Sequence, residues 1–426
     1  MPTLPDPRAA GTVLVGMSGG VDSAVAAWQL REAGFAVQGL FMSNWDDDDA
    51  YCTAAGDFQD ARRVCGILGI PLHRVSFANQ YRERVFAHFL REYAAGRTPN
   101  PDVLCNREIK FGVCLDYMHR LGASWIATGH YARIERSASG VRLLKAVDTA
   151  KDQSYFLHQV APAALAKTLF PLGDLRKDEV RRRAHAAGRP VFDKPDSTGI
   201  CFIGERPFEE FLSRYLRQAA GPIENAAGEV IGEHRGLALY TLGQRAGLRI
   251  GGRAGAAAAP WYVADKDPAR NALIAVQDPA HPLLLSDGFD VENVQWLSGA
   301  MPGMAPPVPA AAGAASVGTA TAGAATPGAR TIETGTGFAC AVKTRYRQGD
   351  LACEVHVGTG VRVALRTAAR AVTPGQYAVF YRGDECLGGG VISRRYNSRA
   401  GEATAPRAAQ SGAAAFGAAT PAPARA

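Results

Sequence analysis

The stretch TVLVGMSGGVDS, residues 12–23, decides the architecture of the first part of this chain. Residues 12–17 are apolar and rich in β-branched side chains, which predicts a buried strand. Residues 18–23 then lead directly into a segment with helical periodicity. A strand that passes through small residues into a helix gathers backbone N–H groups at the positive end of the helix dipole. The stretch therefore predicts a phosphate-binding loop.

The loop differs from the P-loop of other nucleotide-binding proteins because no Gly-Lys-Ser/Thr follows it. It resembles the pyrophosphate loop of the ATP pyrophosphatase superfamily, whose members split ATP between the α and β phosphates and adenylate an acceptor. The resemblance implies that Gly19 and Gly20 let the backbone approach the phosphates, and that Ser18 and Ser23 add hydroxyl donors. Asp22 would cap the helix or help hold Mg²⁺. The alternative is an ordinary glycine-rich turn, and the loop alone leaves the acceptor open.

The composition indicates a cytoplasmic globular protein. A chain of 426 residues with 47% hydrophobic and 20% charged residues is expected to form two or three domains. We expect no signal peptide and no membrane span, because no apolar run is long enough. The net charge of +7 fits a polyanionic partner, although a general Arg bias would also produce it. More specific is a basic cluster in one helical segment, at Arg176, Lys177, Arg181, Arg182, Arg183 and Arg189.

The eight cysteines are too few for a disulfide scaffold of this length. The sequence holds no Cys-x-x-Cys pair, which argues against a zinc ribbon and against an iron–sulfur cluster built on such a pair. Each cysteine must therefore be judged by its surroundings.

Strand and helix patterns alternate from residue 11 to about residue 131, which predicts a doubly wound parallel sheet. Ligands of such sheets bind at the carboxyl ends of the strands, where residues 18–23 lie. We expect a catalytic α/β domain over residues 11–207, with strands at 12–17, 36–42, 72–77 and 124–128 and helices at 22–33, 56–68, 80–94 and 108–121.

The rest of the chain predicts two smaller domains. Residues 208–280 have a short, mixed pattern typical of a small central domain. Residues 281–396 carry closely spaced alternating runs with Gly/Pro turns, which predict a β-barrel or sandwich. Residues 301–330 and 397–426 are dominated by Ala, Gly, Pro and Thr, so we expect a flexible insertion and a disordered tail.

Two cysteines stand in distinctive surroundings. Cys105 closes TPNPDVLC, residues 98–105, where two prolines and two Asx residues predict a rigid non-helical turn just before a helix. A helix N-terminus stabilises a thiolate, although a buried structural cysteine is the alternative. Cys201 follows the turn DSTGI and could equally be a buried hydrophobic residue. His130, in TGHYAR at the end of a sheet strand, could face a ligand, cap an element or lie in the core.

Taken together, these segments resemble the bacterial tRNA-specific 2-thiouridylase family. The resemblance runs from residue 12 to about residue 395, without the Ala/Gly/Pro insertion. It rests on the motifs GMSGGVDS, NPDVLC, GHYAR, KDQSY, STGIC, YTLGQR, KTRYR and PGQ, in this order.

The resemblance implies a role for each matching residue. ATP contacts are expected at Gly16, Met17, Ser18, Gly19, Gly20, Val21, Asp22, Ser23, Met42 and Gly129. Contacts with the target uridine are expected at Asn100, Pro101 and Asp102, and contacts with tRNA at His130, Lys151, Asp152, Gln153, Arg345, Tyr346 and Gln376. Cys105 would be the nucleophile, and Cys201 would carry the persulfide. Mg²⁺ would accompany ATP, without an assigned protein ligand set.

The implied chemistry explains why these residue types occur together. The oxygen at C2 of uracil is a poor leaving group, so adenylation must precede attack by sulfur. A cysteine desulfurase or sulfur-relay protein would load Cys201. Cys105 would then release the sulfur as sulfide, or resolve the spent cysteine through a Cys105–Cys201 disulfide. The enzyme must also expose the base, and we expect the basic helix and the C-terminal β region to hold the tRNA.

Two other functions remain open from the sequence. Another superfamily member that adenylates a small carboxylate or carbonyl would explain the loop, but not the two isolated cysteines or the basic C-terminal region. The other function is that of an RNA-binding module with a degenerate nucleotide loop. The loop has every polar residue that binding would need, which argues against this function. The acidic run at residues 46–49 is interpreted as a solvated loop.

Overall fold

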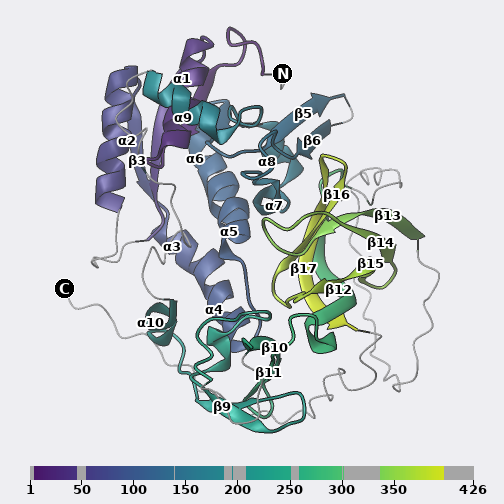
Figure 1. Ribbon diagram of the computed structural model, residues 1–426. Helices are drawn as coiled ribbons and strands as arrows, with labels where there is room; N and C mark the ends of the chain where they lie inside the picture. Colours follow the sequence, from purple (N-terminus) through teal and green to yellow (C-terminus); the bar gives the residue numbers. More distant parts are fainter. Residues whose placement is uncertain are drawn as a thin grey trace, which may run out of the picture.

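The computed structural model describes residues 4–45, 54–138, 140–186, 194, 208–250, 259–299, 301 and 336–397. Figure 1 shows an α/β domain, a small domain of short strands and a β-barrel that lies beside both. Within the described residues, no helix has the length and apolar character needed to cross a membrane.

The first domain is built on a five-stranded sheet within the described ranges, in the order β3-β2-β1-β4-β7, and its neighbouring strands are parallel. The strands are β1 (Thr12–Gly16), β2 (Ala36–Ser43), β3 (Leu72–Ser76), β4 (Trp125–Ala127) and β7 (Thr168–Leu169). In β1 the side chains alternate between two hydrophobic clusters: Val13 and Val15 join one, and Leu14 joins the other. The central strand is thus buried on both faces, as the apolar run predicts.

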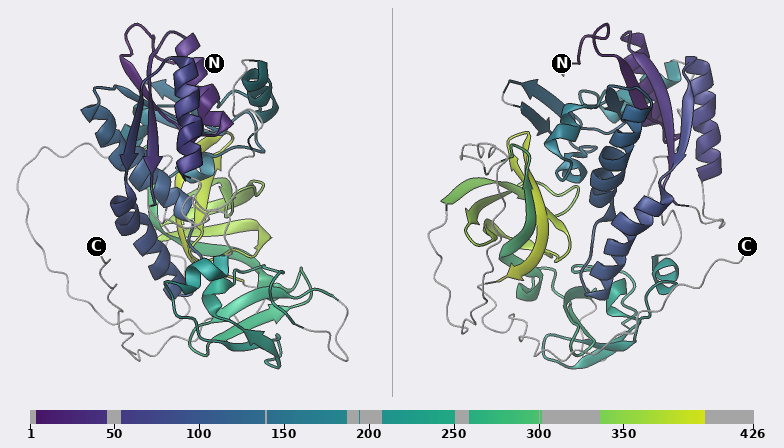
Figure 2. Two further views of the ribbon diagram at one scale, coloured as in Figure 1. Left: turned by 90° about the vertical axis from the view of Figure 1, so that its left-hand side faces the viewer. Right: turned by 180° about the vertical axis from the view of Figure 1, so that it is seen from behind.

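Helices cover both faces of this sheet, so the predicted doubly wound fold is confirmed (Figure 2). On one face α1 (Val21–Glu32) and α2 (Ala54–Leu68) pack on Val13 and Val15, and α9 (Lys177–Ala186) packs on α1. The opposite face carries two long helical runs. These are α3 (Ala78–Tyr81), η1 (Arg82–Phe86) and α4 (Ala87–Ala94), then α5 (Pro101–Leu104), η2 (Cys105–Val113) and α6 (Cys114–Arg120).

The second helical run begins earlier than the sequence predicted. We expected a non-helical turn up to Cys105 and a helix from residue 108, but the chain is helical from Pro101. Asn100 is the N-cap residue, and its side chain accepts a hydrogen bond from the backbone N–H of Asp102. Proline at the first helical position has no N–H to leave unpaired, so Asn-Pro-Asp starts the helix rather than delaying it.

The second domain holds a four-stranded mixed sheet of the described chain, in the order β10-β11-β8-β9. Its elements are α10 (Phe208–Ser213), β8 (Gly221–Glu224), β9 (Val230–His234), η3 (Leu237–Leu239), β10 (Tyr262–Asp267) and β11 (Ala272–Val276).

The third domain is a closed antiparallel barrel, because β12 pairs with both β15 and β17. It contains η4 (Pro282–Leu284), β12 (Leu285–Trp296), β13 (Thr336–Lys343), β14 (Leu351–Val357), β15 (Val361–Arg370), β16 (Tyr377–Arg382) and β17 (Glu385–Tyr396). The predicted barrel is therefore confirmed.

A hairpin of the first domain extends the sheet of the barrel. It consists of β5 (Arg133–Ser137) and β6 (Gly140–Leu144), which pair with each other, and β6 pairs with β17 through Leu143 and Leu144. An ion pair of 2.8 Å between Arg133 and Asp384 joins the two parts again. Two small α-helices of the first domain, α7 (Ser154–Leu157) and α8 (Pro162–Ala166), follow this hairpin in the chain.

Candidate nucleotide and tRNA site

The loop between β1 and α1 has a backbone that only glycine can adopt at one position. Gly19 has a φ of +75°, and a Cβ on it would lie 2.4 Å from the carbonyl oxygen of Asp57. The Ser23 hydroxyl accepts from the backbone N–H of Ser18 at 3.2 Å and donates to the carbonyl of Gly20 at 3.0 Å. These bonds close the loop around the first turn of α1.

The loop presents the N-terminus of α1 toward the carboxyl ends of the strands. Gly20 is the N-cap in an extended conformation and has no side chain to occupy the first-turn amides. A Cβ on Gly20 would meet only the Ser18 hydroxyl, at 3.5 Å, so the approach to these amides is open. The exposed Ser18 adds a hydroxyl. An open helix N-terminus of this kind fits a phosphate group.

Three other residues predicted to contact ATP lie around the same loop. A Cβ on Gly129 would be 2.8 Å from the backbone N of Ser23, so the segment after β4 packs directly against the loop. The Met42 side chain, from β2, lies against Gly16 at the end of β1. The structure thus brings together the residues predicted from three separate strands.

The carboxylate of Asp22 is engaged by protein donors. It accepts from the Tyr131 hydroxyl at 2.8 Å and from Lys177 Nζ at 2.7 and 2.8 Å. The N-cap position of α1 is taken by Gly20 rather than by Asp22, which lies in the first turn. Both carboxylate oxygens of Asp22 thus already accept hydrogen bonds from protein donors, and its predicted role as a Mg²⁺ ligand stays a prediction. No group of three or more potential metal ligands of the His, Cys, Asp and Glu types occurs within the described chain.

Lys194 is a neighbour of the loop that the sequence did not point to. Its Nζ lies 3.3 Å from the carbonyl oxygen of Gly19, and 2.7 and 2.6 Å from carboxylate oxygens of Asp57 and Asp60 on α2. No local motif marks a lysine whose partners lie more than 130 residues away in the sequence.

The segment predicted to meet the target base is rigid and partly buried. Asn100 caps the helix, Pro101 occupies its first position, and the exposed fraction of Cys105 is 1%. Cys105 lies in the second turn of this helical run, close to its N-terminus as predicted. Cys201, the predicted partner of Cys105, lies outside the described residues, as do Arg189, the acidic run at 46–49, most of the insertion and nearly all of the tail.

His130 follows Gly129 and lies between aromatic rings. Its Nδ1 is 2.7 Å from the Thr128 hydroxyl, and its ring contacts Phe111 and Phe170. Burial, followed by the charge of Lys110, lowers the pKa of His130 well below its usual range. His130 is therefore neutral near pH 7, and a contact with RNA would use a hydrogen bond rather than a charge.

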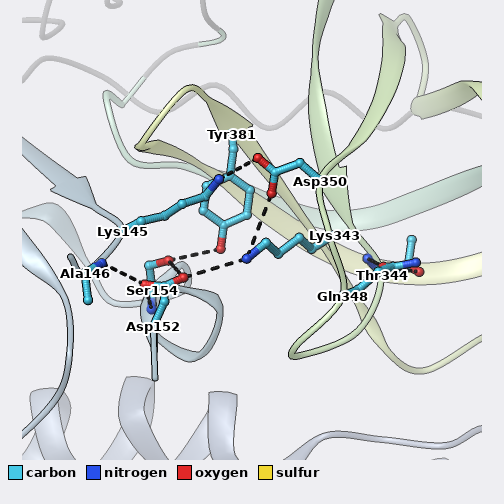
Figure 3. Close-up of polar contacts among 9 residues, drawn as sticks. All are labelled: Lys145, Ala146, Asp152, Ser154, Lys343, Thr344, Gln348, Asp350 and Tyr381. Atoms are coloured by element: carbon cyan, nitrogen blue, oxygen red, sulfur yellow. Dashed lines mark hydrogen bonds and ion pairs between the residues drawn. The ribbon is translucent and has the colours of Figure 1, made fainter. Parts of the chain in front are cut away.

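Asp152 belongs to a buried polar network between the first domain and the barrel (Figure 3). Its carboxylate accepts from the backbone N–H of Ala146 at 3.0 Å, from the Ser154 hydroxyl at 2.9 Å and from the Ser154 N–H, and it lies 3.8 Å from Lys343 Nζ. Burial raises the pKa of Asp152, and these partners act in the opposite direction.

The same network continues through residues of both domains. Lys145 pairs with Asp350 of the barrel at 2.5 Å and lies over the ring of Tyr381, whose hydroxyl is 3.1 Å from that of Ser154. The neighbouring Gln153 accepts from the backbone N–H of Tyr131 at 2.9 Å. Two of the three residues at 151–153 therefore hold protein segments together.

The other residues predicted to contact tRNA also lie at domain boundaries. One guanidinium nitrogen of Arg345 donates to the carbonyls of Leu242 in the second domain and Ala371 in the barrel, at 2.8 and 2.7 Å. Tyr346 packs on Phe156 of α7, with ring centroids 4.4 Å apart. Gln376 donates to the carbonyl of Thr98 at 2.8 Å. These residues lie on the side of the barrel that contacts the first and second domains, and most of them have protein partners.

The basic helix α9 is less positive than its arginines suggest. Arg182 pairs with Asp178 and Glu179, and Arg183 pairs with Glu179 on the same helix. Lys177 is bound to Asp22. Much of the predicted charge is therefore balanced within the described chain.

Three family models match this chain. They are described as a tRNA methyl transferase HUP domain over residues 11–205, a tRNA methyl transferase PRC-barrel domain over 209–277 and an aminomethyltransferase β-barrel domain over 329–392.

Curated relatives match over nearly the whole chain. A protein from Marinobacter nauticus named tRNA-specific 2-thiouridylase MnmA is 51% identical over 400 residues, which cover 92% of this chain and 94% of that protein. A protein of the same name from Chromohalobacter salexigens is 53% identical over 399 residues, covering 92% and 96%. Among solved structures, a U34-tRNA thiolase NcsA from Methanococcus maripaludis gives a TM-score of 0.31 at 19% identity, covering 48% of this chain and 63% of that one.

Proposed function

Because the chain belongs to the tRNA-specific 2-thiouridylase family, we propose that it adenylates the C2 oxygen of the wobble uridine of tRNA and replaces that oxygen with persulfide sulfur. The proposal rests on the sequence identity with the two thiouridylases above, which is 51% and 53% over 92% of the chain. The loop at 18–23 supports the same conclusion because its helix N-terminus suits a phosphate group.

ATP would supply the adenylyl group, and the pyrophosphate would leave at the loop. The first-turn amides of α1 and the Ser18 hydroxyl would hold the phosphates, with Gly19 and Gly20 allowing their close approach. Met42 and Gly129 would line the same end of the sheet. We assign no step to Mg²⁺, because the only acidic residue of the loop is paired with Lys177.

The two cysteines would divide the sulfur chemistry. A donor protein loads Cys201 with a persulfide, and the outer sulfur atom ends on C2 as AMP leaves with the former C2 oxygen. Cys105 attacks the inner sulfur of Cys201, either before or after the outer sulfur reaches C2, and forms a Cys105–Cys201 disulfide. A thiol reductant must then return both cysteines to thiols. Asn100–Asp102 would hold the target base, since the N-cap and the proline fix this segment before Cys105.

The tRNA would lie across the first domain and the side of the barrel that faces it. His130, Lys151 and Tyr346 are the residues of the predicted set that we propose as direct contacts. The protein engagement of Asp152, Arg345 and Gln376 supports an indirect role for those three.

Product analysis tests the proposed function. The full-length protein is incubated with ATP, tRNA and a persulfide donor, and the nucleotides and digested nucleosides are identified by mass spectrometry. We expect AMP, pyrophosphate and a 2-thiouridine derivative. Release of ADP and phosphate would refute the ATP chemistry. Methylated nucleosides formed with S-adenosylmethionine, in place of thiolated ones, would refute the sulfur chemistry and favour the activity that two of the family models describe.

A further inference from the structure

A four-residue turn, 96–99, connects the end of α4 to Asn100, and all three domains meet at it. Gly96 has a φ of +75° and ends α4: its N–H donates to the carbonyl of Tyr93, and the N–H of Arg97 donates to that of Glu92. This pair of bonds is the usual glycine-ended helix terminus. Arg97 also binds Glu92 through its side chain. The start of the turn is therefore fixed to the first domain.

The second domain holds the turn through Lys266. The Nζ of this lysine, on β10, donates to the carbonyl of Gly96 at 3.2 Å. A Cβ on Gly96 would lie 3.5 Å from the ring of Pro268, just beyond β10. The second domain thus packs on the turn as well as bonding to it.

The barrel holds the other end of the turn through residues 374–376. The N–H of Thr98 donates to the carbonyl of Pro374 at 3.0 Å, and Gln376 Nε2 donates to the carbonyls of Thr98 and Pro99 at 2.8 and 3.4 Å. Gly375 has a φ of +91°, and a Cβ on it would lie 2.8 Å from the Thr98 nitrogen. The contact is too close for any residue other than glycine.

We propose that Lys266 and Gln376 are positioning residues that set the place of Asn100–Asp102 and Cys105 from the second domain and the barrel. The proposal rests on the proposed function, in which these residues meet the target base and carry the sulfur chemistry. The turn runs straight into the Asn100 cap and Pro101, so a shift of the turn moves the start of the helix that bears Cys105. Misplacement of a reacting group by about 1 Å can lower a rate roughly a hundredfold.

This role differs from a direct tRNA contact, which the sequence motif implied for Gln376. Its amide is already used on two carbonyls of the turn. The positioning role also assigns a function to the second domain, from which we have proposed no residue for the chemistry itself.

The test compares Gln376→Met with a matched control, Gln295→Met. Gln295 is likewise a half-buried glutamine of the barrel, and its Nε2 donates to a carbonyl of the first domain, that of Val160, at 3.0 Å. We expect Gln376→Met to lower the kcat of tRNA-dependent pyrophosphate release about tenfold or more while the Kd for tRNA stays within about twofold. Gln295→Met should change neither value by more than about twofold. A raised Kd with an unchanged kcat, or equal losses in both variants, would overturn the proposal.

Lys266→Met is the second variant and should show the same loss of kcat at constant Kd. Lys266→Arg should restore most of the rate, because a guanidinium can donate to the same carbonyl. The double variant Lys266→Met with Gln376→Met should lose less than the product of the two single losses, since both act through one turn. A wild-type rate in Lys266→Met would remove the second domain from the proposal.

A readout without substrates separates this proposal from the proposed function. The rate of alkylation of Cys105 by iodoacetamide is measured by peptide mass spectrometry in the full-length variants. Because Cys105 is buried, displacement of its helix should raise that rate about fivefold or more in Gln376→Met and Lys266→Met relative to Gln295→Met. Equal alkylation rates would refute the positioning role. A wild-type protein that releases no pyrophosphate with tRNA would refute the proposed function alone.

Discussion

Lys177 reaches from α9 to the first turn of α1, where its Nζ lies 2.7 and 2.8 Å from the two carboxylate oxygens of Asp22. The pair is largely shielded from water, since the Lys177 side chain is 11% exposed and that of Asp22 is 31% exposed. It ties α9 to the first turn of α1, at the end of the loop at residues 18–23. The one acidic residue of the loop thus has a structural partner.

Lys177→Met should lower the free energy of unfolding by about 1–3 kcal/mol, because a partly buried carboxylate loses its counter-charge. The double variant Asp22→Asn with Lys177→Met should lose less than the sum of the single variants. Urea unfolding measures both. The control is Arg182→Met on the same helix, whose exposed ion pairs should contribute nothing measurable. Equal stability of Lys177→Met and this control would contradict the prediction.

Lys194→Met should weaken ATP binding. The change leaves Asp57 and Asp60 without the ammonium that lies between them, beside the loop that we propose to receive the phosphates. We expect the Kd for ATP to rise about tenfold at low ionic strength and less at high salt, since exposed charges are screened. Calorimetry at two salt concentrations measures the effect. Adding Asp57→Asn and Asp60→Asn to Lys194→Met should restore most of the affinity, and an unrestored Kd would contradict the electrostatic explanation.

The sequence predicted the parts of the fold that depend on neighbouring residues. The β1 strand, the glycine loop and α1 follow one another in 21 residues, and their hydrophobic pattern and turn chemistry agree. The pairing of β6 with β17 could not be foreseen, because it joins Leu143 to Cys386 across the whole second domain. Such pairings depend on tertiary contacts that no local pattern records.

The candidate site shows the same division. The structure brings Gly16, Met42 and Gly129 together around the loop, and their contact with ATP stays a prediction. For Asp152 and Gln376 the motif gave the position but not the partner, since a polar side chain that holds two domains together looks the same in sequence as one that binds RNA. Lys194 and Lys266 carry no motif signal because their partners are distant in the chain.

Asp152→Ala should loosen the barrel from the first domain. The change removes the acceptor of two buried backbone N–H groups and of the Ser154 hydroxyl, and it leaves Lys343 without one of its carboxylates. We expect a loss of about 2–4 kcal/mol in the free energy of unfolding. Urea unfolding measures it, and Lys151→Ala at the neighbouring position is the control. Asp152→Ala as stable as Lys151→Ala would contradict the network's structural role.

Lys266 should make stability depend on pH in the alkaline range. Burial lowers its pKa from 10.5 to about 8. Between these values the unfolded chain binds more protons than the folded one, so the free energy of unfolding should rise with pH there. The rise is at most about 3 kcal/mol, and Lys266→Met should remove it. Urea unfolding of both proteins from about pH 7 to about pH 10 tests this, because the difference cancels other titrating groups. Parallel profiles would contradict it.

Cys201→Ser should abolish thiolation while leaving tRNA-dependent pyrophosphate release intact, since adenylation of the base precedes the arrival of sulfur. Cys105→Ser should also retain pyrophosphate release but fail to complete a turnover, because no thiol can attack the inner sulfur of Cys201. The two activities are measured on the same samples, by pyrophosphate assay and by nucleoside mass spectrometry. Cys340→Ser is the control, since Cys340 lies in the barrel, 3.6 Å from Cys353, and has no part in the proposed chemistry. Thiolation by Cys201→Ser with a sulfur donor supplied would show that another group carries the persulfide.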